Sequence, residues 1–301
     1  MTPWPSLAPY GKFLSAKDGE LFYYDSINDA SLNANTAKPA LVLIHGLGDE
    51  ADTWRHVFPQ LAKAAPAGYR VLAPDLPGFG RSAWKGNISV EGHRDAVLRL
   101  MAETGAASAS NPAVLVGSSL GAGIAELAAF SRPELVKSLV LIDGCFPVSG
   151  SLEKGFFLLS LPFIGKRWYR GFRKNHEAAW KSLFPYYGDL DAMDTADREF
   201  LRERVIARVE SPNQERGYLS TVKSMNHFTV SAEKKLSQKL SKYPGKITLL
   251  WGDKDAVFPQ EKASLFRSLR PDAELIVIPG GHLPHQEKPE ECAAEIIRTL
   301  A

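Results

Sequence analysis

The sequence has few of the features that mark disulfide-bonded, metal-binding or membrane-spanning proteins. It contains only two cysteines, Cys145 and Cys292, and neither lies in a Cys-x-x-Cys motif or beside clustered histidines. No apolar run approaches the roughly 18 residues that a bilayer-spanning helix needs. The longest candidate, residues 156–164, is interrupted by Ser160 and Pro162. We therefore expect two buried, reduced thiols, no metal site and no integral membrane segment.

An excess of charge of one sign is also missing. The formal net charge is +2, which is too small to indicate a nucleic-acid ligand without a concentrated basic stripe. One basic cluster lies among aromatic residues and is interpreted as a solvated helix face. It consists of Lys166, Arg167, Arg170, Arg173 and Lys174. The first residues show no basic start followed by an apolar run, so we expect no signal peptide and a cytoplasmic location.

Short apolar runs alternate with amphipathic segments over most of the chain. The runs are continuous, as in strands buried on both faces of a parallel sheet. They fall at residues 40–44, 69–73, 113–116, 138–142, 246–251 and 274–278, with helical patterns at 90–101, 121–130, 260–269 and 289–300. This order predicts a mostly parallel, doubly wound α/β sheet flanked by helices. Residues 11–25 predict an antiparallel hairpin added to the sheet edge.

The regular alternation stops between about residues 146 and 243. This stretch has no strand-like run, and a structureless loop of that length is implausible in a compact domain. We therefore predict an inserted helical cap, residues 146–243, within a core formed by residues 1–145 and 244–301. A minority of the cap aromatics is expected to line a pocket, and the others to form the cap's own core. They are Phe156, Phe157, Phe163, Trp168, Tyr169, Phe172, Trp180, Phe184, Tyr186 and Tyr187. For residues 155–164, packing within the cap is favoured over a mobile lid or a lipid-contacting face.

The strongest chemical signal is Gly117-Ser118-Ser119-Leu120-Gly121, which follows one predicted strand and precedes a helix. A Gly-x-Ser-x-Gly motif in this context forms a sharp turn that lifts the central serine above the sheet edge. Larger side chains two positions away would collide with the backbone. The turn also places the serine at a helix N-terminus, which favours developing negative charge. Ser119 is therefore the predicted nucleophile, and Ser118 is a neighbour without a catalytic role.

A serine nucleophile needs a base beside it and an acid that orients the base. His282 follows the apolar run at 274–278, behind two glycines that allow a loop to return over Ser119. His285 lies three residues further on and is expected at the surface or in a supporting role. His282 is the predicted base.

The acid should stand at the carboxyl end of a strand that precedes the histidine in the chain. Asp255 and Asp253 follow the run at 246–251, and Asp143 follows an earlier one. Asp253 is expected to act as a structural or capping carboxylate. Asp255 is favoured as the acid, with Asp143 and then Asp253 as alternatives.

Acyl transfer also needs two donors for the oxyanion. The backbone N–H of Leu120, next to the nucleophile, is one candidate. The other is the N–H of Leu47 in the glycine-containing loop His45-Gly46-Leu47-Gly48, where the backbone can approach closely. His45 is expected to brace this loop by hydrogen bonding.

Together these motifs resemble the α/β-hydrolase superfamily in its cap-bearing branch. The resemblance rests on residues 45–48, 75–82, 117–121, 252–255 with Pro259, and 281–289, which occur in the family's order. It implies that Asp255, three residues after the glycine of a Gly-x-x-Asp pattern, is the acid. It also implies that residues 75–82 are scaffold and that the insertion is the family's cap.

The resemblance also narrows the chemistry. Haloalkane dehalogenases and epoxide hydrolases of this shape carry aspartate where this chain has Ser119. A serine there implies an esterase, lipase, thioesterase, lactonase, amidase or carbon–carbon bond hydrolase, with no metal or organic cofactor. The apolar side chains of the cap favour a hydrophobic acyl or aromatic ester as the substrate, so the favoured interpretation is a serine carboxylesterase that acts through an acyl-enzyme on a small, mostly apolar substrate. A carbon–carbon bond hydrolase of ring-cleavage products, a ligand-sensing protein on a hydrolase scaffold, and a cofactor-free oxygenase or perhydrolase remain as alternatives.

Overall fold

The computed structural model describes residues 1–27, 39–64, 69–146 and 154–300, without the side chains of residues 154–156 and 226–234. Within these residues, eight strands form one sheet in the order β1-β2-β4-β3-β5-β6-β7-β8. The strands are β1 (Gly11–Ala16), β2 (Gly19–Asp25), β3 (Leu41–Ile44), β4 (Val71–Pro74), β5 (Ala113–Ser118), β6 (Val136–Ile142), β7 (Lys246–Gly252) and β8 (Glu274–Ile278). Six neighbouring strands, from β4 to β8, run parallel.

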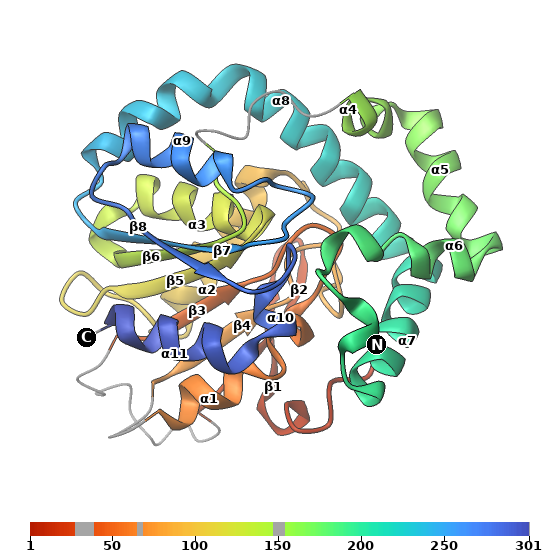
Figure 1. The fold of residues 1–301 in the computed structure, drawn as a ribbon, viewed down its shortest axis with the longest axis horizontal. Helices are drawn as coiled ribbons and strands as arrows, with labels where there is room; N and C mark the ends of the chain where they lie inside the picture. Colours follow the sequence, from red (N-terminus) through yellow and green to blue (C-terminus); the bar gives the residue numbers. More distant parts are fainter. Residues whose placement is uncertain (28–38, 65–68, 147–153, 301) are drawn as a thin grey trace.

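The predicted sheet is confirmed in type and in position. Each of the six apolar runs coincides with a parallel strand. The predicted hairpin is β1 and β2, which pair antiparallel. β2 then pairs antiparallel with β4, so the hairpin extends the sheet at one edge. The result is the α/β-hydrolase architecture expected from the sequence, with a mostly parallel sheet between helical layers (Figure 1).

Helices cover both faces of the sheet, because each parallel crossover returns over one face. α1 (Val57–Lys63) and α11 (Pro289–Leu300) pack on one face, around a core that includes Trp54 and Ile296. α2 (Val90–Glu103), α3 (Leu120–Ser131), the end of α8 (Pro212–Lys242) and α9 (Glu261–Leu269) cover the other face. Cys145 and Cys292 are buried free thiols, one in each of these cores. No helix in the described ranges is both long and apolar enough to cross a membrane.

The described chain between β6 and β7 contains no strand and is mostly helical. It contains α4 (Lys154–Ser160), α5 (Pro162–Lys174), α6 (His176–Lys181), α7 (Thr195–Glu210) and α8, with short 3-10 turns at Phe184–Tyr186 and Leu190–Ala192. α4 to α7 lie at one end of the sheet (Figure 1, green). α8 begins among them, and Leu236 and Leu240 near its end join the core. The helical insertion therefore faces the rim where the parallel strands end, and one long helix links it to the sheet layers.

Candidate active site

The turn between β5 and α3 holds Ser119 in a conformation that non-glycine residues rarely adopt. Its φ is 55°, in a region that costs most side chains free energy. A Cβ on Gly117 would collide with the carbonyl oxygen of Gly121, and a Cβ on Gly121 with that of Ile44. The Ser119 N–H donates to the carbonyl of Ile142 on β6 at 2.8 Å. Both motif glycines are therefore required, for the steric reason that the sequence suggested.

The structure brings the three favoured side chains together in one hydrogen-bonded chain. His282 Nε2 lies 2.9 Å from Ser119 Oγ, and His282 Nδ1 lies 2.8 Å from Asp255 Oδ2. A carboxylate only accepts hydrogen bonds, so Nδ1 carries the proton that faces Asp255. Nε2 of the neutral ring is then free to accept the proton of the serine hydroxyl. The imidazole and the carboxylate are both buried.

Backbone groups fix the orientation of the Asp255 carboxylate. Its Oδ1 accepts the N–H groups of Val257 and Phe258, each at 2.8 Å. Oδ2 is therefore the oxygen left for His282. The backbone of the loop after β7 therefore orients the Asp255 carboxylate so that one oxygen faces the imidazole.

Two further carboxylates hold the loop that carries His282. Asp253 Oδ1 accepts the N–H of Gly280 at 2.9 Å, and Glu287 Oε2 accepts the N–H of Gly281 at 2.6 Å. The expected structural role of Asp253 is confirmed. Glu287, on the short helix α10 (Pro284–Glu287), was not assigned this role from the sequence.

Asp143 does not contact His282. It ends β6 with φ 49°, and its Oδ1 accepts the N–H of Gly252 at 2.8 Å. Burial, followed by the neighbouring Asp255 carboxylate, raises the pKa of Asp143 well above its usual range. Asp143 therefore lies behind the carboxylate that contacts His282, in surroundings that favour its protonated form.

The loop after β3 lies against Ser119. A Cβ on Gly46 would be only 3.2 Å from Ser119 Cβ. His45 Nε2 accepts the N–H of Leu76 at 2.9 Å, and its Nδ1 donates to the Gly46 carbonyl at 2.8 Å, which confirms its bracing role. Leu47 lines the pocket. Leu120 is the first residue of α3, where a backbone N–H has no acceptor within its own helix.

His285 is buried, so the expectation of a surface position was wrong. Its Nε2 lies 2.9 Å from Thr53 Oγ1, and its ring lies 4.4 Å from that of Trp54. Burial lowers its pKa to about 3, so the ring is neutral at pH 7. His285 packs α10 onto the core beneath the loop that carries His282. This matches the supporting role that was the other expectation for His285.

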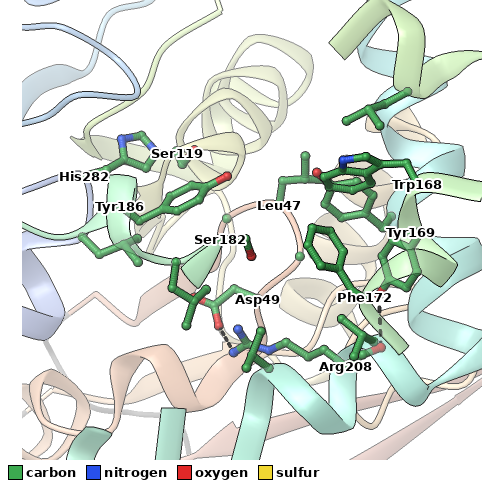
Figure 2. A pocket seen from close by; sticks show the side chains of 18 of the residues that line it. Leu47, Asp49, Ser119, Trp168, Tyr169, Phe172, Ser182, Tyr186, Arg208 and His282 are labelled. Atoms are coloured by element: carbon green, nitrogen blue, oxygen red, sulfur yellow. Dashed lines mark hydrogen bonds and ion pairs between the residues drawn. The ribbon is translucent and has the colours of Figure 1, made fainter. Parts of the chain in front are cut away.

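A pocket of about 590 Å³ opens from Ser119 and His282 towards the insertion (Figure 2). The ring of Tyr186 lies beside that of His282, with 5.7 Å between their centroids. Five of the nine described aromatics among the ten predicted cap aromatics line the pocket, so the expectation of a minority was wrong. These five are Trp168, Tyr169, Phe172, Tyr186 and Tyr187. The tenth, Phe156, lies outside the described side chains. Tyr218, which the sequence did not single out, also lines the pocket.

Comparison with known families decides the classification. Residues 41–295 match the family described as the alpha/beta hydrolase family. The chain belongs to this family. Among curated alpha/beta hydrolase relatives, Lipase 1 of Psychrobacter immobilis is 27% identical over 87% of this chain and 76% of that protein. Pimeloyl-[acyl-carrier protein] methyl ester esterase of Klebsiella pneumoniae is 28% identical over 83% of this chain and 88% of that protein.

Solved structures of the family share the fold. The crystal structure of a putative lipase from Acinetobacter baumannii superposes with a TM-score of 0.72, covering 96% of this chain and 90% of that one at 21% identity. These relatives support a hydrolase whose general chemistry is ester cleavage.

One charged group of this alpha/beta hydrolase reaches the pocket from α7. Arg208 is the only lysine or arginine among the described lining residues, and it pairs with Asp49 and with Glu50, the latter at 2.7 Å (Figure 2 shows the Asp49 pair). Burial would raise the pKa of Glu50, but Arg208 and two further arginines lower it to about 2. No sequence pattern indicates this pair, because Arg208 is 158 residues away from Glu50 in the chain. Arg208 is therefore neutralised and ties the insertion to the core.

Proposed function

We propose that this protein is a serine carboxylesterase that cleaves a small, mostly apolar ester through an acyl-enzyme. The observation that carries the proposal is the chain Ser119–His282–Asp255, with bonds of 2.9 and 2.8 Å, at the inner end of an aromatic-lined pocket. A hydroxyl, a neutral imidazole and a buried carboxylate in this order form the minimum set for nucleophilic acyl transfer.

In the proposed reaction, His282 Nε2 takes the proton of Ser119 Oγ while the oxygen attacks the ester carbonyl. The N–H groups of Leu47 and Leu120 donate hydrogen bonds to the oxyanion of the tetrahedral intermediate and so stabilise its negative charge. The imidazolium then gives its proton to the departing alkoxide, and the alcohol leaves. Water attacks the acyl-enzyme by the same proton transfers, and the acid product is released. Each oxyanion donor typically contributes about 3 kcal/mol to this type of transition state.

The pocket favours a neutral acyl or aromatic group. Most lining side chains are aliphatic or aromatic, and such walls bind apolar ligand surface. The insertion, residues 146–243, would then act as a cap that shapes the acyl site on a core of residues 1–145 and 244–301. We keep a cytoplasmic location as part of the proposal.

The carbon–carbon hydrolase alternative receives no specific support. It needs a cation that holds the carboxylate of a ring-cleavage product, and the arginine lining the described pocket is already paired with two acids. Measuring ester turnover distinguishes an esterase from a ligand-sensing protein on the same scaffold.

The test is an ester panel together with fluorophosphonate labelling. Wild type should hydrolyse p-nitrophenyl esters and be labelled at Ser119, and Ser119→Ala should abolish labelling and lower kcat by about 10⁶-fold. Ser118→Ala is the matched control, since the neighbouring hydroxyl is buried and has no hydrogen-bond partner. Saturable ester binding without turnover would support the sensor, and undiminished turnover by Ser119→Ala would refute the proposal.

A further inference from the structure

The junction of α4 and α5 exposes an unusual amount of apolar surface. Phe163 is 89% exposed, and five neighbours are between 36% and 49% exposed. We call this group the apolar tip: Phe157, Leu158, Leu161, Phe163, Ile164 and Trp168. Packing within the cap, which the sequence favoured for residues 155–164, was therefore wrong for five side chains of that range, Phe157, Leu158, Leu161, Phe163 and Ile164. Isolated exposed apolar residues are common, but a group gathered at the junction of two consecutive helices marks a contact surface.

The segment that carries the apolar tip is rich in positive charge and has no acidic residue. Residues 154–174 contain six basic residues and no aspartate or glutamate. The basic residues are Lys154, Lys166, Arg167, Arg170, Arg173 and Lys174. Arg170 and Arg173 pair with Glu215 on α8.

The remaining described cations of this segment lie on α5, the helix that carries Phe163. Lys166, Arg167 and Lys174 are exposed and form no ion pair within the described residues. Phe163, Arg167 and Lys174 are spaced at i, i+4 and i+11, which places them on one side of α5. The tip therefore combines an exposed aromatic ring with uncompensated positive charge.

The apolar tip is continuous with the pocket. Leu158, Ile164 and Trp168 line the pocket and are also exposed. Trp168 lies across the pocket from Ser119 and His282 in Figure 2, and α4 and α5 lie at the outer edge of the molecule in Figure 1. The pocket therefore reaches the surface at the tip.

We propose that the apolar tip and its basic residues dock onto an anionic lipid surface. Aromatic and aliphatic side chains enter the boundary between headgroups and acyl chains, while lysine and arginine remain with the anionic headgroups. A lipid bilayer fits this surface better than a protein groove does, because the uncompensated cations match a continuous negative surface. Docking in this way places the pocket opening against the lipid, so an apolar substrate reaches Ser119 without crossing water. Docking itself does not depend on the proposed esterase activity.

The experiment is vesicle flotation of the full chain. Purified wild type is mixed with vesicles of phosphatidylcholine alone, or of phosphatidylcholine with phosphatidylglycerol, and floated on a density gradient. Wild type should float with the mixed vesicles, and salt should weaken this binding because it screens the lysines and arginines. Ser119→Ala should float equally well, so failure of the esterase proposal would leave this result unchanged.

Two variants separate the apolar from the electrostatic contribution. Phe163→Asp should weaken binding by about tenfold, because one largely exposed ring no longer inserts. Replacing Lys166, Arg167 and Lys174 by glutamine should weaken binding roughly 100-fold, at about fivefold for each cation near an anionic surface.

Matched controls carry the same changes elsewhere. Leu265→Asp replaces a 50% exposed leucine on α9. Glutamine at Lys235, Lys239 and Lys242 removes three exposed lysines near the end of α8. Both controls should bind like wild type, and thermal unfolding should show that all variants remain folded.

Three results would overturn the proposal. The first is that wild type does not float with the mixed vesicles. The second is that the α8 control loses as much binding as the α5 variant, which would indicate attraction by net charge alone. The third is a dimer in sedimentation that Phe163→Asp dissociates, because the tip would then be an interface between two copies.

Discussion

The sheet rim and the helical insertion meet at the same pocket but are organised differently. At the rim, backbone geometry places the candidate catalytic groups: Ser119 has a positive φ, and Asp255 is oriented by two backbone N–H groups. In the insertion, side chains do the positioning, through aromatic packing and the Arg208 pairs. A site held by backbone tolerates little change, whereas a wall of side chains can be altered residue by residue. The chemistry should therefore depend on the rim, and substrate range on the insertion.

The sharpest way to test the rim is to compare its two acids. Asp255→Asn should lower kcat by about 10³–10⁴-fold, because an amide no longer stabilises the imidazolium or fixes its tautomer. Asp143→Asn should lower kcat by less than about tenfold, because Asp143 makes no hydrogen bond to His282 and the amide resembles the protonated carboxyl, the form that burial and Asp255 favour there. Steady-state ester hydrolysis measures both. A larger loss at residue 143 than at residue 255 would reverse the assignment of the acid.

Much of this rim could be predicted from the sequence, because its determinants are local. Gly117 and Gly121, two positions before and after Ser119, are visible in the sequence, and the structure shows that a Cβ at either position would collide with backbone atoms. Parallel strands appear as continuous apolar runs, and their carboxyl ends must meet at one edge. Residues that follow different strands, such as Asp255 and His282, could therefore be expected to converge. Their hydrogen bonds bring them together, and their roles stay predictions until turnover is measured.

The insertion was less predictable, because helical periodicity does not say what each face meets. The aromatic content indicated a cap, but which rings line the pocket depends on how five helices cross. Phe163 looks like a core residue in the sequence and is 89% exposed. His285 looks like a surface residue in the sequence after His282 and is buried against Trp54. In each case tertiary packing decided the burial, and no local pattern encodes it.

The junction between the two regions supplies the next largest expected effect. Arg208→Leu should lower the free energy of unfolding by about 3–5 kcal/mol, because it leaves the Glu50 carboxylate buried without its main partner. Arg202→Leu is the control on the same helix. Arg202 pairs with Glu177 where both side chains are about half exposed, so its loss should cost less than about 1 kcal/mol. Urea unfolding compares the two variants, and equal losses would show that the buried pair does not hold the insertion.

The same substitution has a predicted pH dependence. The pKa of Glu50 is lowered from 4.5 to about 2, so its contribution to stability is complete above pH 4.5 and is lost as the pH falls through about 2. Arg208→Leu removes much of the stability that ionised Glu50 contributes, at every pH. The difference in free energy of unfolding between wild type and this variant should therefore be largest near neutral pH and shrink on acidification. A difference that grows towards low pH would contradict this account of the pair.

The smallest expected effect tests whether the insertion sets substrate range. Phe172 lies across the pocket from Ser119, in edge contact with Trp168 (Figure 2). Phe172→Ala should lower kcat/KM for long-chain p-nitrophenyl esters by about tenfold, since a long acyl group loses apolar contact at that wall. The acetyl ester does not extend so far, and its kcat/KM should stay within about twofold of wild type. A uniform loss across all chain lengths would instead mean that this ring supports the rim, and the division between a chemical rim and a selective insertion would not hold at this position.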